Sequence, residues 1–196
     1  MHRPTIAGFL SIVLIAVAQT GLAAGGQQYD YRVLATRKTS TMQKELNEAG
    51  SAGFRFESIM GGSTEWGGSE SVVIVSRDRL GDKKGSFEYK LLATNKTSTM
   101  QKEIQQAGDE GFMYKGQTVF ETSFGGKEVV VIMERDQGAK PEHYEYKLLA
   151  TKKTSTMQRE LMEAAETGFR FIGLTVAETA FGGKELVTIL FRTAAR

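Results

Sequence analysis

The sequence predicts an α+β protein built from three tandem β-α-β-β repeats, each a three-stranded sheet with one covering helix. One unit occurs three times without a gap, at residues 29–78, 87–136 and 144–193, with offsets of 58 and 57 residues. A unit of about 50 residues is only marginally stable without a disulfide or a metal, and the chain contains no cysteine. We therefore expect the three units to pack against one another, as neighbours in repeat proteins do.

Each unit opens with a run that alternates between apolar and charged residues. In the first unit Tyr29, Tyr31 and Val33 fall on one face, and the same alternation starts at residues 87 and 144. A period of two with aromatic residues on one side predicts a half-buried strand.

A helix is predicted next in each unit. Ser40 and Gln43 have the spacing of a capping box, and Met42 and Leu46 begin an apolar stripe at helical spacing. Gly53 suits the left-handed residue that ends a helix. The pattern recurs in the other two units and predicts a helix of about three turns that covers one face of a sheet.

Two further strands complete the unit. The second strand is predicted from Phe54, Phe112 and Phe169, and a glycine-containing turn separates it from the third strand. The third strand is the most apolar run and lacks clean alternation, which predicts cover on both faces or a central place in the sheet. A right-handed crossover makes the first two strands parallel. The hairpin makes the third antiparallel to the second, and we place it between them.

Two arrangements of the units agree with the sequence. If outer strands pair edge to edge, the units form a pseudo-threefold body with helices outside and few unpaired strand edges. A row of three side-by-side sheets is the alternative. The linkers, residues 79–86 and 137–143, are polar and too short to let the units drift far apart.

Residues 1–24 have the layout of a secretory signal peptide. Arg3 gives a positive start, residues 6–18 are largely apolar, and small residues follow. The apolar run is short for a membrane span, which needs about 20 residues. We expect cleavage near Ala23 or Ala24 and an exported protein, periplasmic or extracellular, with no membrane span after cleavage. An uncleaved N-terminal anchor is the alternative.

Three elements of the unit also carry a family resemblance: Tyr29, Tyr31 and Arg32 in the first strand, residues 45–54 across the helix end, and an apolar last strand that ends on Arg77. In these elements each repeat resembles a small bacterial family, the domain of unknown function numbered 4177. The chain departs from the family where phenylalanine replaces the usual tryptophan at the start of the second strand. Ala165 also replaces the first glycine of the motif in the third unit. The resemblance implies a β-α-β-β fold and no activity or site that could be transferred.

The composition argues against several classes of function. The formal net charge is +2, which gives no concentrated basic face for nucleic acid. The absence of cysteine removes thiolate nucleophiles and zinc–thiolate sites. Beyond the signal segment His143 is the only histidine, and it lies in a linker, a poor place for a relay or a metal ligand. We predict a non-enzymatic protein with no catalytic residue, metal or cofactor.

The first candidate site lies at the helix starts. A helix N-terminus presents free N–H groups and a partial positive charge, so hydroxyl groups and a lysine there suit an anion. Simple capping with a solvated lysine is the alternative. The candidate anion-binding residues are Lys38, Ser40, Thr41, Lys96, Ser98, Thr99, Lys153, Ser155 and Thr156.

The second candidate site is the aromatic residue before each Gly-Gly turn: Trp66, Phe124 and Phe181. Aromatic side chains at a hairpin tip serve as contact anchors for partners. The alternative is that each ring folds back onto its own sheet and leaves the glycines to make the turn.

From these features we expect an exported binding or structural protein. It would present three similar surfaces to an unknown macromolecular partner, with avidity from the three copies. The alternative is a small-molecule or anion-binding protein that uses the helix N-termini of the repeats.

Overall fold

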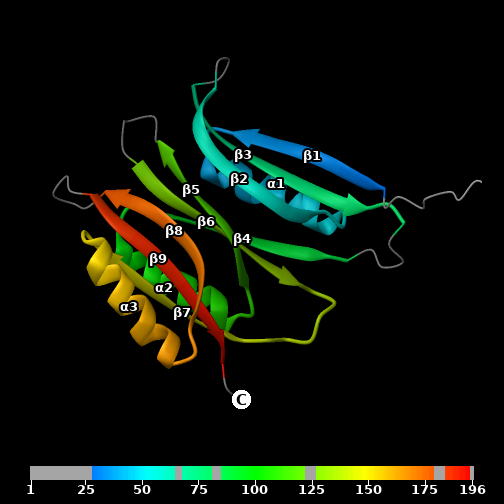
Figure 1. Cartoon of the computed structure of the whole chain (residues 1–196). Coiled ribbons are helices and arrows are strands. Elements are labelled where there is room, and N and C mark those ends of the chain that lie inside the picture. Colours follow the sequence, from blue (N-terminus) through cyan, green and yellow to red (C-terminus); the bar gives the residue numbers. More distant parts are fainter. Residues whose placement is uncertain (1–27, 65–67, 81–84, 122–126, 179–183, 195–196) are drawn as a thin grey trace, which may run out of the picture.

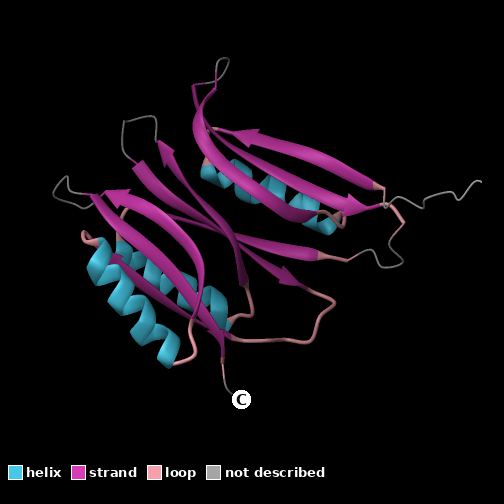
Figure 2. Cartoon of the chain, viewed as in Figure 1, coloured by secondary structure: helices cyan, strands magenta, loops and turns pink. Residues whose placement is uncertain are grey.

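The computed structural model describes residues 28–64, 68–80, 85–121, 127–178 and 184–194. These residues form three repeats of strand, helix, strand and strand, which follow one another across the molecule (Figures 1 and 2). The predicted α+β fold of three β-α-β-β repeats is therefore confirmed.

The helices and strands have closely matched lengths in the three repeats. Repeat 1 contains β1 (Tyr29–Thr36), α1 (Thr39–Ser51), β2 (Arg55–Thr64) and β3 (Gly68–Asp78). Repeat 2 contains β4 (Phe87–Thr94), α2 (Thr97–Asp109), β5 (Met113–Glu121) and β6 (Lys127–Asp136). Repeat 3 contains β7 (Tyr144–Thr151), α3 (Thr154–Glu166), β8 (Arg170–Glu178) and β9 (Lys184–Thr193).

Each sheet has its third strand in the middle. The strand orders are β1-β3-β2, β4-β6-β5 and β7-β9-β8, and both neighbours of the central strand run antiparallel to it. The first and second strands of each repeat are thus parallel to each other, as the right-handed crossover predicts. The predicted central place of the most apolar strand is confirmed.

The predicted helix stop is confirmed, and the predicted helix start is wrong. Gly53 has a φ of 82°, and the N–H of Phe54 donates to the carbonyl of Ala49 at 3.0 Å, which is a Schellman ending. The second strand therefore begins one residue later than expected. At the other end, the cap residue is Lys38 and no side chain caps the helix. Because the helix begins at Thr39, Ser40 lies inside the helix and does not form a capping box with Gln43. The Gln43 side chain instead bonds the backbone of the next repeat.

The three sheets are stacked and do not pair edge to edge. Within the described residues, the strands of each sheet all come from one repeat. The edge pairing expected for a closed pseudo-threefold body is therefore not found. The physical reason is that α1 packs against β4 and α2 packs against β7, so the helix of one repeat occupies the side of the next repeat's first strand. On the opposite side of the stack β2 contacts β5, and β5 contacts β8.

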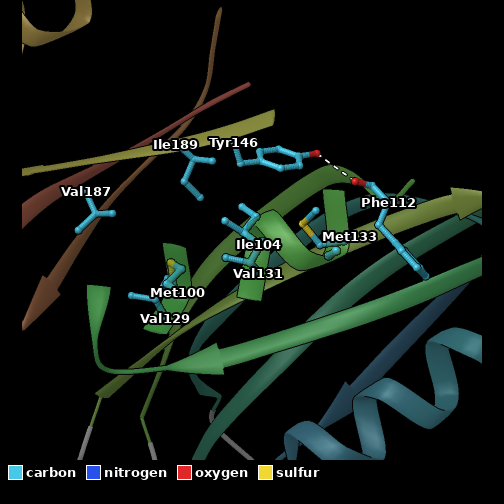
Figure 3. Packing of buried hydrophobic residues seen from close by; sticks show 10 residues of the cluster. Met100, Ile104, Phe112, Val129, Val131, Met133, Tyr146, Val187 and Ile189 are labelled. Carbon is cyan, nitrogen blue, oxygen red and sulfur yellow. Dashed lines mark hydrogen bonds between the residues drawn. The ribbon is translucent and has the colours of Figure 1, made fainter. Parts of the chain in front are cut away.

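The middle sheet shows how one sheet faces two helices. On β6, Val131 and Met133 belong to the core that contains Ile104 of α2, whereas Ile132 belongs to the core that contains Leu46 of α1. Both faces of this strand are therefore buried, which explains why its sequence does not alternate. Figure 3 shows the core around α2, in which side chains of β6, β7 and β9 surround Ile104.

A repeated arginine holds the end of each sheet to the end of its helix. Arg77 donates to Asp30 at 2.8 Å and to the carbonyl of Ala52 at 3.1 Å, and its guanidinium lies 4.7 Å from the ring centre of Phe54. The same three contacts recur in repeats 2 and 3. The arginine that ends the last strand therefore has a structural role.

Candidate functional site

The helix of one repeat binds the free edge of the next repeat's first strand through a glutamine side chain. Gln43 donates to the carbonyl of Tyr89 at 2.6 Å and accepts from the N–H of Leu91 at 2.6 Å. Gln101 makes the same pair of bonds with Tyr146 and Leu148, at 3.0 and 2.7 Å. The side-chain amide thus takes the place of a neighbouring strand. We call these contacts junction 1, between repeats 1 and 2, and junction 2, between repeats 2 and 3.

A second amide side chain and a buried tyrosine complete each junction. In junction 1 the side-chain oxygen of Asn47 accepts from the N–H of Tyr89 at 2.8 Å. The Tyr89 hydroxyl accepts from the N–H of Phe56 at 2.8 Å and donates to Glu134 at 2.7 Å. Burial is the largest cause that raises the pKa of Tyr89 above its ordinary value, and the nearby Glu134 carboxylate adds to it.

Junction 2 repeats this arrangement with small changes. Gln105 replaces the asparagine and accepts from the N–H of Tyr146 at 2.8 Å. The Tyr146 hydroxyl accepts from the N–H of Tyr114 at 2.8 Å and donates to the carbonyl of Phe112 at 3.2 Å, the bond drawn in Figure 3. Burial raises the pKa of Tyr146 as well, and it raises the pKa of Tyr114 to about 12. Two copies of one docking arrangement therefore exist inside the chain.

Glycine allows the close approach in both junctions. A Cβ atom at Gly50 would lie 2.2 Å from the carbonyl oxygen of Phe87, and one at Gly108 would lie 2.4 Å from the carbonyl oxygen of Tyr144. Backbone oxygens cannot yield as the end of a long side chain can, so any larger residue would push the helix away from the strand.

No helix precedes repeat 1 among the described residues, and the corresponding surface of this repeat is exposed. Tyr31 is 65% exposed, whereas its equivalents Tyr89 and Tyr146 are 1% and 4% exposed. Val33 and Met60 on the same sheet are also mostly exposed. We call the surface formed by Tyr31, Val33, Met60 and the half-buried Val72 and Ile74 the N-terminal face.

The aromatic side of the predicted half-buried strand is therefore buried in β4 and β7 and exposed in β1. The aromatic side of this strand packs against the preceding repeat and not against its own helix. Repeat 1 buries the opposite side of β1, where Leu34 joins the core around Met42 and Leu46.

The other end of the stack also exposes apolar side chains. Met162, Phe171, Leu174 and Val176 are 59%, 57%, 51% and 46% exposed. Met162 stands where the junctions have Asn47 or Gln105, and Ala165 stands where they have glycine. The two ends of the molecule thus differ: one presents a bare sheet, and the other presents α3 and the face of β8 (Figure 1).

A cleft formed mainly by repeat 2 and the linker that follows it borders a buried carboxylate. Its volume is about 630 Å³, and Arg55, Lys115, Glu134 and the linker around Pro141 line it. The side chain of Glu134 is 4% exposed, with Arg55 at 2.9 Å and Lys115 at 3.5 Å. Burial by itself raises the pKa of Glu134, but Lys115 and the bonds from Tyr89 and Arg55 outweigh it and hold that pKa below its ordinary value. Because Arg55 of repeat 1 and Tyr89 of repeat 2 both donate to this carboxylate, it belongs to junction 1.

The predicted anion-binding residues lie at three separate helix starts. Lys38, Lys96 and Lys153 are the cap residues, in extended conformation, and no side chain caps any of the three helices. At α1, Ser40 lines a shallow groove of about 360 Å³, but Glu103 lines the same groove and would repel an anion. The remaining candidates, Thr41, Ser98, Thr99, Ser155 and Thr156, belong to the first turns of the same helices.

The structure does not test the aromatic residues that were predicted as contact anchors. Trp66, Phe124 and Phe181 lie outside the described residues. His143 is exposed, and its Nδ1 lies 2.6 Å from the carbonyl oxygen of Asp109, at the end of α2. No cluster of histidine and acidic side chains suited to a metal ion occurs in the part of the chain that the structure describes. No described helix is both long and apolar enough to span a membrane.

Searched against family models, curated proteins and solved structures, the chain matches none of them. The resemblance to the domain of unknown function numbered 4177 therefore stays a prediction. The function has to be argued from the geometry of the chain itself.

The sequence reasoning missed the residues that build the junctions. The capping-box interpretation covers Gln43 and its equivalent Gln101, and the motif at the helix end covers Gly50 and its equivalent Gly108. One signal was available: alanine replaces the glycine only in the third unit, at Ala165, and no described repeat packs against that helix from the other side. Terminal repeats are commonly atypical at the positions that contact a neighbour.

Proposed function

We propose that this protein is an exported, non-enzymatic binding module that docks another protein on its N-terminal face. The observation that supports this proposal is the 65% exposure of both Tyr31 and Val33, in a position that the chain itself covers twice elsewhere. Contiguous exposed apolar side chains of this kind are typical of interaction surfaces.

The gain from covering this face is large enough to support specific binding. Full burial of one large apolar side chain is worth about 1.5–3 kcal/mol, and Tyr31, Val33 and Met60 all lie on this face. β1 is also an edge strand, so its outer backbone groups are available to a partner. Apolar contact and backbone hydrogen bonding together give both affinity and register.

Site-specific photo-cross-linking tests the proposal. A photoreactive amino acid at Val33 should cross-link a protein in an extract of the cell envelope, and the same group at the exposed Lys102 on α2 should not. Adding Tyr31→Lys to the first variant should abolish the product, because a charge then lies in the centre of the contact. Equal labelling at both positions, or none at Val33, would refute the proposal.

Binding of a small anionic ligand at the helix starts is the second candidate function. The observation that favours it is the absence of any side-chain cap on α1, α2 and α3, which leaves the first N–H groups open to a ligand. Phosphate should then shift the amide resonances of Thr41, Thr99 and Thr156. Unchanged resonances at millimolar phosphate would remove this candidate.

A further inference from the structure

We infer that the occupant of the N-terminal face is an α-helix of another polypeptide, recognised by a glutamine and by a glycine seven residues after it. This inference rests on the proposed function and specifies the partner. It follows from the two junctions, in which the same surface of repeats 2 and 3 already holds such a helix.

The N-terminal face offers the same recognition groups as the two occupied surfaces. Tyr31 is the equivalent of Tyr89 and Tyr146, and Val33 is the equivalent of Leu91 and Leu148. In both junctions the carbonyl of the tyrosine and the N–H two residues later bind one glutamine. The backbone of β1 has the same edge position in its sheet. The N-terminal face thus has the same groups as the two surfaces that hold a helix, but it is exposed.

The junctions also define the partner's sequence pattern. The helices that dock carry Met-Gln-x-x-(Leu or Ile)-(Asn or Gln)-x-Ala-Gly, at residues 42–50 and 100–108. The methionine, leucine or isoleucine, and alanine are buried in the junction cores. The two amide residues bind the strand backbone, and the glycine lets the strand carbonyl approach. A partner helix needs these groups in this spacing.

The chain's own last helix does not meet these requirements, so a second copy is not the occupant. The thioether of Met162 in α3 is only a weak acceptor, and it does not replace the amide oxygen with which Asn47 and Gln105 accept the strand N–H. Ala165 would bring a Cβ atom to the position that lies 2.2 to 2.4 Å from a carbonyl oxygen in the junctions.

A third feature, on the N-terminal face itself, also disfavours docking of a second copy. Ser58 replaces Gly116 and Gly173, and a Cβ atom at those glycines would meet the ring of Phe56 at 2.8 Å and the hydroxyl of Tyr114 at 2.5 Å. In a contact between two copies, Phe171 of one copy would take the place of Phe56 or Tyr114 and would meet Ser58 of the other copy. Both ends therefore depart from the junction pattern at the points of closest approach.

The decisive experiment restores the junction pattern at both ends of the full chain. The variant Ser58→Gly/Met162→Gln/Ala165→Gly gives α3 the features of α2 and removes the obstruction on the N-terminal face. All three residues are exposed, so the fold should be retained, which thermal unfolding checks. Sedimentation velocity should show a single monomeric species for the unmodified protein. For the triple variant it should show head-to-tail association at least about tenfold stronger, and adding Tyr31→Lys should reverse that association.

Each other outcome overturns the inference. A triple variant that stays folded and monomeric would show that the face does not accept a helix of this pattern. Association of the unmodified protein as strong as that of the triple variant would make a second copy the occupant. If association appears only after removal of residues 1–24, the chain's own N-terminal segment is the occupant. Association that Tyr31→Lys leaves unchanged would place the contact elsewhere.

A second measurement does not depend on the triple variant. A synthetic peptide with the sequence of residues 95–112 should shift the amide resonances of Tyr31 and Val33 in the full-length protein. A matched peptide with Gln105→Met and Gly108→Ala should bind at least about tenfold more weakly, and equal binding of the two would overturn the inference. Cross-links at Val33 together with failure of both experiments would leave the proposed function standing and remove the helix as the partner.

Discussion

At the scale of single residues, the buried polar groups of this protein differ in whether they have partners. Glu134 is buried with Arg55, Lys115 and Tyr89 around it. The Thr188 hydroxyl and the Gln117 amide are buried without a hydrogen-bond partner within the described part of the chain. Removing one member of a paired buried charge is destabilising, because it leaves the other member uncompensated, whereas an unpaired buried polar group already costs about 1–3 kcal/mol. Each case therefore makes a different prediction.

We expect Thr188→Val to stabilise the protein by about 1 kcal/mol. Thr188 is fully buried, and the equivalent positions in the first two repeats are Val73 and Val131, which are also fully buried. Valine keeps the shape and removes the unpaired hydroxyl. Urea unfolding of the two proteins measures the difference. A loss of stability in the variant would mean that the hydroxyl has a partner after all.

We expect Glu134→Gln to destabilise the protein by about 1–3 kcal/mol at neutral pH, with a smaller effect in acid. Since the pKa of Glu134 is lower in the folded protein than its ordinary value, the carboxylate contributes stability above the ordinary pKa. That contribution is lost as the pH falls through the folded value. Urea unfolding of both proteins at neutral pH and below about pH 4 measures the change. A difference that does not shrink in acid would contradict this account.

At the scale of helices and strands, the same helix sequence lies in two environments. α1 and α2 each bury a methionine, a leucine or isoleucine, an alanine and a glycine, because each is covered by its own sheet and by the next one. α3 buries only Ala164, because among the described strands it packs mainly against β7 and β8 of its own repeat. The position of a repeat in the stack therefore decides how much its helix contributes to the core.

We expect Gly50→Ala to destabilise the protein although alanine favours helix. The gain in helix propensity is about 1 kcal/mol, but the new Cβ atom would lie 2.2 Å from the carbonyl oxygen of Phe87. Moving the helix away from β4 weakens the whole of junction 1, and overpacking of this kind costs about 1–3 kcal/mol. Thermal unfolding measures the net effect.

The matched control for this prediction is Ala165→Gly, at the equivalent exposed position of α3. This change should cost about 1 kcal/mol or less, through helix propensity alone. If Gly50→Ala proves stabilising, α1 and β4 do not approach as closely as described.

At the scale of the whole molecule, the stack is a short array in which each repeat depends on its neighbours. The helix of each of the first two repeats forms a core with the next repeat, and Gln43 and Gln101 bind the next repeat's backbone. Arrays of this kind owe much of their stability to the interfaces between units. The two ends of the stack differ from the middle. At the N-terminal face, Tyr31 and the edge of β1 correspond to groups that are covered in the two junctions.

We expect the isolated middle repeat, residues 85–143, to be largely unfolded. Separation would expose Tyr89 and Ile132 on one side and Ile104 and Ala107 on the other, all of them buried in the full chain. Circular dichroism and urea unfolding of the fragment, compared with residues 25–196, measure the loss. An equal urea midpoint would show that the repeats are independent and that the junctions contribute nothing to stability.

The sequence alone was sufficient for the internal order of each repeat. Alternation at Tyr29, helical spacing at Met42 and the left-handed glycine at Gly53 are local signals, and local backbone preferences produce them. The handedness of the crossover then placed the most apolar strand in the middle of each sheet, as the structure confirms.

The tertiary structure decided which surface covers which. The sequence shows that the tyrosine side of the first strand is apolar, but periodicity does not say whether its own helix or a neighbouring repeat covers it. That depends on packing between units, to which residues far apart in the sequence contribute, such as Gln43 and Tyr89. For the same reason the exposure of Tyr31 was invisible in the sequence, where it has the same pattern as its two buried equivalents.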